Sequence, residues 1–462
     1  MKFDARISAM TVGVGTMVVG MQASAVAASL PEIARHTGMG MARSPWILVI
    51  YTLVLSSSMI SLGRLGDVVG YKPVYLAGLT LFTVASGFIG MSTSFPVLIA
   101  LRALQGAGAA MVSATSLALL AHGRLVREYG EAIAWQTAMT YTGLALGPIA
   151  AGFFLQRFGW RAIFLINLPA GLIAIFIARQ VLQDPSGNRR SLHDLKLNHS
   201  LGWIAVIAPL VFALSFVHQG ASFILRFALP ALMMAAALVF RTWRQAIVNT
   251  LIPAGTKVSR DYWRIPATEI LCYLCLYGVA FLMPFYLIDN HKVPLALAGY
   301  LLSSQYIARG LTALCSGYAS SRLGIQNARL AGMAILAITL LGLAQLNVQS
   351  SAVLIALLLA GVGVGTGIFV PANSQAIMSC TPAEIQGTAT AILATARNLG
   401  MTLGVPIAAA MYGRFRNTEF NSIRSSMFVL SSLAFFNVLI CGFVQSGGAS
   451  QRAALLIQPS SR

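Results

Sequence analysis

Fourteen long apolar runs follow one another along the chain, and short polar segments separate them. Each run has about 17 to 25 residues, the length that an α-helix needs to cross a bilayer. The runs begin near residues 7, 46, 74, 96, 132, 161, 200, 223, 265, 295, 330, 352, 388 and 425. The pattern therefore predicts an all-α integral membrane protein with fourteen transmembrane helices.

The composition supports this prediction. Of the 462 residues, 57% are hydrophobic and only 9% are charged, whereas a soluble domain has roughly 25% charged residues. A net charge of +19 would suggest nucleic-acid binding in a soluble protein, but here Lys and Arg are scattered through the interhelical segments. Because they do not gather with aromatic side chains, we expect no nucleic-acid partner.

The distribution of Lys and Arg also indicates an orientation. With both termini in the cytoplasm, 18 of these cations fall inside and 9 outside, which is the bias that cytoplasmic loops show. We interpret the run from Ile7 to Leu30 as the first span and not as a cleaved signal peptide. The expected location is a bacterial inner (plasma) membrane.

The link between the second and third runs combines charges with glycines. It reads GRLGDVVGYKPVYLAG, from Gly63 to Gly78, and about eleven of these residues join the two runs. A carboxylate beside cations at a membrane face can make and break charge-assisted hydrogen bonds as helices move. The link therefore predicts a conformational latch, and ordinary loop charges are the alternative. Its residues are Gly63, Arg64, Gly66, Asp67, Gly70 and Lys72.

The same stretch recurs in the second half of the chain. GYASSRLGIQNARLAG, from Gly317 to Gly332, matches it at five of sixteen positions, and LIAL and PIAA recur in the same order at similar offsets. Three collinear matches indicate two six-helix halves, residues 1–183 and 265–462. The linkers and two inserted helices then occupy residues 184–264. In such repeats the substrate site lies between the halves.

These stretches resemble signatures of the major facilitator superfamily. GRLGDVVGYKPVYLAG is similar to its loop signature, RALQGAGAA from Arg102 to its fourth-span signature, and GLALGPIAAG to its fifth-span antiporter signature. WRAIFLINLP and ATARNLGMTLGVP are similar to its fourteen-span drug:proton antiporter (multidrug efflux) branch. The resemblance covers nearly the whole chain and implies exchange of a small molecule for protons, without a cofactor.

The first span departs from that branch. Gln22 stands where the family places an aspartate, and Ala27 stands where it places an asparagine. Gln22 cannot carry a proton, which weakens the implied coupling. In the second copy of the latch, Ser321 replaces the aspartate.

Four ionisable residues lie within the apolar runs, where an unpaired charge is costly and functional roles are expected. Arg102, Arg309 and Arg397 are candidates for the cavity or a proton relay. Snorkelling to the outer interface is the alternative for Arg102, and Arg309 is also a candidate structural partner for a carbonyl or carboxylate. Glu269 either serves as a helix N-terminal charge near Arg264 or, if it faces the cavity, carries a proton because desolvation favours its neutral form.

The antiporter-like stretch carries no chemical group. Gly143, Gly147, Pro148 and Gly152 are expected to let the fifth helix bend and pack closely between the halves. No set of His, Cys or acidic residues has metal-ligand spacing, and no nucleophile lies beside an acid–base pair, so we expect neither a metal site nor an enzyme.

Together these features predict a secondary active transporter. The first hypothesis is proton-coupled efflux of small amphipathic or cationic compounds by alternating access. The alternative is uptake or facilitated transport of a metabolite with weak or no proton coupling. The expected partners are the small-molecule substrate, protons and membrane lipids, and the chain is expected to act as a monomer.

Overall fold

The computed structural model describes residues 2–38, 43–121, 126–183, 261–381, 386–414 and 419–443. These residues form helices and the turns between them. The first seven helices are α1 (Lys2–His36), α2 (Pro45–Val69), α3 (Tyr71–Met91), α4 (Phe95–Ala121), α5 (Val126–Phe158), α6 (Ala162–Leu165) and α7 (Asn167–Val181). The later ones are α10 (Asp261–Phe285), the π-helical turn η4 (Tyr286–Asn290), α11 (Leu295–Leu323), α12 (Ile325–Ala344), α13 (Ala352–Ser379), α14 (Gln386–Arg414) and α15 (Glu419–Phe443).

Most of these helices are long enough to cross a membrane. Ten of them are also sufficiently apolar, and α2 adds an eleventh if its two bent parts form one span. The all-α membrane class is therefore confirmed. Twelve of the fourteen expected runs lie on described helices, and the runs from residues 200 and 223 fall outside the described residues. The count of fourteen, and the inserted pair, stay predictions.

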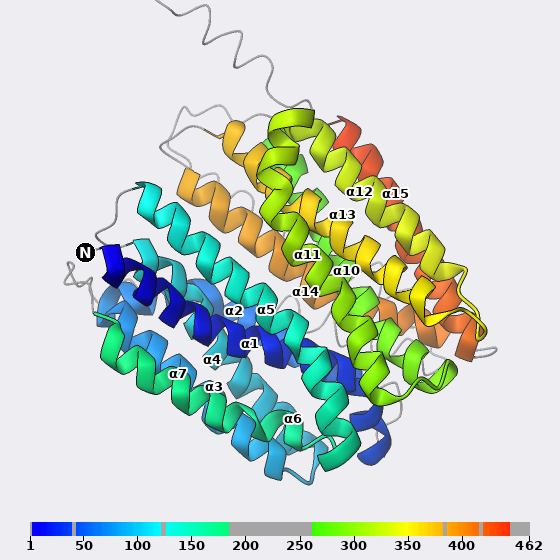
Figure 1. Cartoon of the computed structure of the whole chain (residues 1–462), viewed down its shortest axis with the longest axis horizontal. Coiled ribbons are helices and arrows are strands. Elements are labelled where there is room, and N and C mark those ends of the chain that lie inside the picture. Colours follow the sequence, from blue (N-terminus) through cyan, green and yellow to red (C-terminus); the bar gives the residue numbers. More distant parts are fainter. Residues whose placement is uncertain are drawn as a thin grey trace, which may run out of the picture.

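The described helices form two bundles with the same packing pattern. In the first, α1 packs against α5, α4 against both α2 and α3, and α3 against α7; in the second, α10 packs against α14, α13 against both α11 and α12, and α12 against α15. Figure 1 shows helices α1 to α7 (blue to green) beside helices α10 to α15 (green to red). This correspondence supports the repeat, while the exact boundaries of the two halves stay predictions.

The latch stretch is helical almost throughout, which corrects the expected eleven-residue loop. Helix α2 continues to Val69 and α3 begins at Tyr71, so a single residue, Gly70, joins them. Its φ of 112° lies in a region that L side chains rarely adopt, and Gly324 joins α11 to α12 with a φ of 80°. The helices continue because polar residues outside the apolar run still form backbone hydrogen bonds, until a glycine turns the chain.

The two bundles contact each other through α5 and α11, α2 and α14, and α1 and α10. Between α5 and α11 the backbones are close, since a side chain on Gly152 would overlap the carbonyl of Leu295 and one on Gly299 would overlap the carbonyl of Pro148. The Ser303 hydroxyl also donates to the Ala145 carbonyl at 2.7 Å. Small residues thus allow this close contact, as in many membrane helix interfaces.

Candidate functional site: a cavity between the bundles

A cavity of about 490 Å³ lies between the two bundles. Helices α1, α2, α4 and α5 line it from the first bundle, and α10, α11 and α14 line it from the second. Its volume is in the range of small-molecule sites, roughly 300 to 1,000 Å³. Both bundles therefore contribute to one site, which matches the expected position of a substrate.

The cavity ends where the bundles meet. On α5 its lining stops at Leu144, and past this residue the Ser303 hydroxyl of α11 donates to the Ala145 carbonyl. Beyond these contacts, an ion pair joins Arg35 at the end of α1 to Asp289 in η4, with Glu32 also bound to Arg35. This end of the cavity is therefore closed by packing and, at the surface, by an ion pair between the bundles.

The cavity lining is mostly apolar and contains several tyrosines and three arginines. Its charged side chains are Arg102, Arg309 and Arg397, and no Asp, Glu, Lys or His is among the described residues that line it. The lining therefore offers no carboxylate to the cationic compounds that the sequence led us to expect. The lining tyrosines are Tyr51, Tyr141, Tyr273, Tyr277 and Tyr306.

Arg102 is held inside the first bundle. It has no exposed surface, its Nε donates to the Ile47 carbonyl at 3.0 Å and its Nη1 donates to Gln105 Oε1 at 2.5 Å. The guanidinium lies 4.4 Å from the centre of the Tyr51 ring. Snorkelling to the outer interface is therefore wrong for Arg102, because its guanidinium is enclosed by carbonyl, amide and ring partners, with Nη2 left without a hydrogen-bond partner among the described residues.

Gln22 belongs to the same buried network. Its Oε1 accepts a hydrogen bond from Asn167 Nδ2 at 2.6 Å, and Asn167 and Gln105 both donate to the Ser86 hydroxyl, at 3.4 and 2.6 Å. A chain of polar side chains thus connects Gln22 to Arg102 through the first bundle. Sequence reasoning missed Ser86, Gln105 and Asn167, although each is a polar residue within an apolar run.

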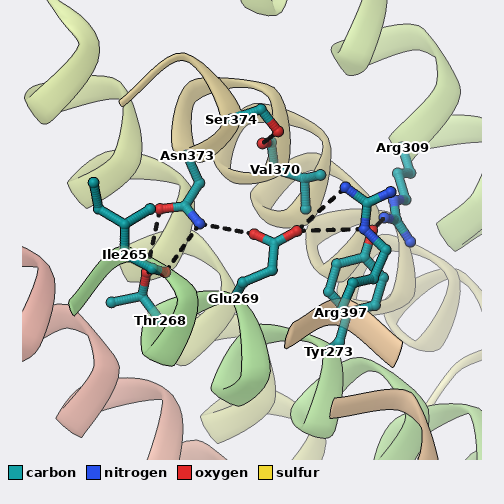
Figure 2. Close-up of polar contacts among 9 residues, drawn as sticks. All are labelled: Ile265, Thr268, Glu269, Tyr273, Arg309, Val370, Asn373, Ser374 and Arg397. Carbon is teal, nitrogen blue, oxygen red and sulfur yellow. Dashed lines mark hydrogen bonds and ion pairs between the residues drawn. The ribbon is translucent and has the colours of Figure 1, made fainter. Parts of the chain in front are cut away.

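Glu269 and Arg397 form the central contact of the second bundle (Figure 2). Arg397 Nη2 lies 3.4 Å from Glu269 Oε1, and Asn373 Nδ2 donates to Glu269 Oε2 at 2.8 Å. The Glu269 side chain has no exposed surface, whereas the Arg397 side chain is 35% exposed. Glu269 is therefore not part of the cavity lining, and Arg397 lies between it and the cavity.

This arrangement differs from the expected helix-terminal charge beside Arg264. The Arg264 guanidinium donates to the carbonyl of Phe443, at 3.0 Å, while Glu269 lies two turns into α10 and binds residues of α13 and α14. Residues 261–268 form the first two turns of α10, so Glu269 lies inside the bundle and not at the helix end. The long-range partners on α13 and α14 explain why local spacing did not predict the contact.

Arg329 extends the network to α12. It is fully buried, its Nε donates to Asn373 Oδ1 at 2.9 Å and its Nη1 donates to Gln326 Oε1 at 3.0 Å. Arg329 thus lies in the first turns of α12 with its side chain inside the bundle. Because Asn373 bonds both Arg329 and Glu269, it connects α12 to the carboxylate.

Arg309 projects from α11 towards the same group. Its Nη2 donates to the Tyr273 hydroxyl at 2.7 Å, and its guanidinium lies 5.2 and 5.4 Å from the ring centres of Tyr273 and Tyr141. Figure 2 shows Arg309 next to Arg397 and Tyr273. Its partners are thus tyrosines and not the carbonyl or carboxylate that we expected for a structural role.

The latch residues lie where α2 meets α3, with partners other than those expected. The Asp67 carboxylate accepts a hydrogen bond from the Tyr71 hydroxyl, and Lys72 donates to the Arg179 carbonyl of α7 at 3.0 Å. Within the described ranges, no ion pair joins Asp67 to Arg64 or Lys72. The charges of this stretch are therefore not joined to one another in this conformation.

The antiporter-like stretch of α5 packs against both bundles. Side chains added at Gly143 and Gly147 would overlap the backbone of α1 at Met17 and Met21, and one at Gly152 would overlap α11. Pro148 lies within the continuous helix, and its carbonyl faces Gly299. Gly152 and Pro148 thus lie at the contact between the bundles, whereas Gly143 and Gly147 pack within the first bundle and not between the halves as expected.

No group of three or more metal-ligating side chains occurs in the described part of the chain. The polar side chains that line the cavity are arginines, tyrosines and side chains with hydroxyl or amide groups. The Glu269 carboxylate lies buried behind Arg397. A concave site with a few converging polar groups is typical of small-molecule binding sites.

Comparison with known proteins agrees with this geometry. The sequence profile of the Major Facilitator Superfamily matches residues 12–405 and, in a second alignment, residues 267–454. The crystal structure of a POT family transporter in complex with a thioalcohol-conjugated peptide superposes with a TM-score of 0.71, covering 94% of each chain at 12% identity. That likeness shows the fold alone.

Three curated relatives are similar in sequence. Riboflavin transporter RibZ of Clostridioides difficile is 27% identical over 92% of each chain. Multidrug resistance protein Stp of Mycobacterium tuberculosis is 29% identical over 86% of this chain and 74% of its own. Methyl viologen resistance protein SmvA of Salmonella typhimurium is 28% identical over 86% of this chain and 80% of its own. With the profile match across most of its length, the chain belongs to the Major Facilitator Superfamily.

Proposed function

We propose that this protein is a proton-coupled exporter of small amphipathic compounds that works by alternating access. The observation that carries the proposal is the cavity between the two bundles, with a buried Glu269–Arg397 ion pair directly behind its wall. A site shared by two bundles is opened to either side by their relative movement. A carboxylate that gains or loses a proton next to the site makes that movement depend on the proton gradient.

Glu269 is the proposed proton carrier. Protonation would cancel its charge and release Arg397, whose guanidinium lines the cavity. Gln22 occupies the position at which the family places an acidic proton carrier. It has no ionisable group and is fully buried. We therefore assign the coupling to the second bundle, although the family resemblance places an aspartate in the first span.

Asp67 is the proposed latch of the opposite end. With both termini in the cytoplasm, the contacts of Ala145 and Ser303 and the Arg35–Asp289 pair lie on the outer side, so this conformation is closed outwards. The Asp67 carboxylate then has no ion pair with Arg64 or Lys72 within the described residues. In the opposite conformation we expect Asp67 to exchange Tyr71 for a cation and hold the inner ends together.

The second candidate function is uptake or facilitated transport with weak or no proton coupling. Gln22 favours it, because a neutral amide bound to Asn167 replaces the acid of the first span. The similarity to a riboflavin transporter favours it too, since the name of that relative does not specify export. The two functions predict opposite effects of the protein on the cellular content of a compound.

Cells that express the protein test these functions. Accumulation of a compound panel, including methyl viologen and riboflavin, is measured with and without a proton uncoupler in wild type and in Glu269→Gln. Export predicts lower accumulation of at least one compound, which the uncoupler and Glu269→Gln both abolish. Arg322→Gln, which changes an exposed side chain outside the cavity, serves as the control. Lower accumulation that persists with the uncoupler contradicts proton coupling, and higher accumulation favours uptake.

A further inference from the structure

The charge of the cavity indicates the charge of its ligand. Arg102, Arg309 and Arg397 line it, and within the described residues the only carboxylate that pairs with any of them is Glu269, on Arg397. Other ion pairs between described residues join Arg35 and His36 to Glu32 at the end of α1, and Arg35 to Asp289 in η4. Two arginines of the cavity therefore have no acidic partner.

Arg309 is the better placed of these two to bind a ligand. Its side chain is buried to 94%, its Nη2 donates to the Tyr273 hydroxyl, and its Nε has no hydrogen-bond partner among the described residues. Arg102 also has one nitrogen, Nη2, without a partner among the described residues, but it donates through Nε and Nη1 to Ile47 and Gln105 and has no exposed surface. A buried guanidinium with an unused donor and no counter-ion is costly in a membrane protein unless an anion binds it.

Aromatic rings surround this guanidinium. The rings of Tyr141 from α5 and Tyr273 from α10 both lie within 5.4 Å of the Arg309 guanidinium, measured to the ring centres. These two tyrosines come from different bundles, and Tyr277 and Tyr306 add further aromatic surface to the cavity. Tyrosine faces pack against planar ring systems, and the arginine adds a hydrogen-bonding group at one end.

We propose that the transported compound is a planar aromatic anion, whose carboxylate or similar negative group binds Arg309 and whose rings pack against the tyrosines that line the cavity. The proposal rests on the proposed transport function and specifies its substrate class. It also explains why the site needs no acid in its lining. A cation of the same size finds aromatic faces there, but it lies beside guanidinium groups that repel it.

Three naphthalene derivatives with the same ring substitution test the proposal: naphthoate, naphthamide and naphthylmethylammonium, which carry a negative, neutral and positive group. Isothermal titration calorimetry measures their binding to the full chain in lipid nanodiscs, at one pH and without a gradient. We expect naphthoate to bind about 10- to 100-fold more tightly than the other two, the range of a charge-assisted hydrogen bond. Arg309→Gln should remove this preference, and Arg309→Lys should retain part of it.

Arg322→Gln is the matched control, because Arg322 lies on the same helix with an exposed side chain. It should bind naphthoate as the wild type does, and a monodisperse elution profile shows that each variant is folded. Equal binding of the anion and the cation, unchanged naphthoate binding in Arg309→Gln, or no naphthoate binding to the wild type would each overturn the proposal. These results are independent of the uncoupler experiment, so a failed substrate class is distinguished from a failed coupling mechanism.

Discussion

At the scale of single residues, the Glu269–Arg397 pair combines a fully buried acid with a partly exposed base. Asn373 binds the acid on one side and Arg397 binds it on the other (Figure 2). Removal of one partner from a buried pair leaves an uncompensated charge, which costs about 3 to 5 kcal/mol when both groups are fully buried. The cost is smaller here, because the Arg397 side chain is 35% exposed.

Arg397→Gln should therefore lower the melting temperature more than the double variant Glu269→Gln/Arg397→Gln, in which no buried carboxylate remains. Thermal unfolding of the purified proteins in detergent measures the difference, with Arg322→Gln as a variant that removes an exposed arginine. An equal loss in the single and double variants would show that the two side chains do not stabilise each other.

Gln22 offers a test of how coupling is divided between the bundles. Gln22→Asp places a carboxylate next to Asn167 and within the polar chain that leads to Arg102. If Glu269 already couples transport to protons, the pH profile of transport should change little. A strong new pH dependence, measured as initial rates between pH 5 and 8, would favour the weakly coupled alternative. Asn167→Asp adds an acid at the neighbouring position and serves as the comparison.

At the scale of helices, glycines decide how closely neighbours approach. A side chain at Gly143 would overlap the Met17 carbonyl of α1, whereas nothing lies within 4 Å of the position that a side chain at Gly317 would take. Both glycines lie inside helices, where alanine is normally more stable by about 1 kcal/mol. The two positions are therefore a matched pair, for which we expect opposite changes in stability on substitution by alanine.

Gly143→Ala should destabilise the protein by about 1 to 3 kcal/mol, the usual cost of overpacking, and Gly317→Ala should leave the stability unchanged or increase it. Thermal unfolding and the yield of monodisperse protein measure both variants. A stable Gly143→Ala variant with normal transport would contradict the close contact between α5 and α1.

The helices also show what the sequence can predict. Apolar runs identified the described spans, because the bilayer requires continuous backbone hydrogen bonding within each of them. The same reasoning marked Arg102, Arg309, Arg397 and Glu269 as important. It did not identify their partners, since Asn373 on α13 and Asn167 on α7 are distant in sequence and only the packing brings them close.

At the scale of the whole molecule, the two bundles are the moving parts of the proposed cycle. They touch on one side of the cavity through Ala145, Gly152 and α11. On the other side, α2 and α3 meet at Gly70 with Asp67 one turn away. Alternating access requires that contacts at one end form as those at the other end break.

Asp67→Asn should therefore favour the conformation described here and slow transport, while binding of naphthoate is retained. The amide still bonds to Tyr71 but cannot pair with a cation, so only the opposite conformation is destabilised. Transport and binding measured on the same preparation separate the two effects, and Asp289→Asn provides a control at the other end. Normal transport by Asp67→Asn would rule out the latch.

The Arg35–Asp289 pair links this cycle to the medium in which the cell lives. Its side chains are exposed to 51% and 26%, and dissolved ions screen exposed charges over about 10 Å at 0.1 M salt. Under the proposed orientation the pair faces the outside, so external salinity weakens this contact while the buried Glu269–Arg397 pair is shielded. The balance between the two conformations, and with it the turnover rate, would then follow the salt content of the surroundings.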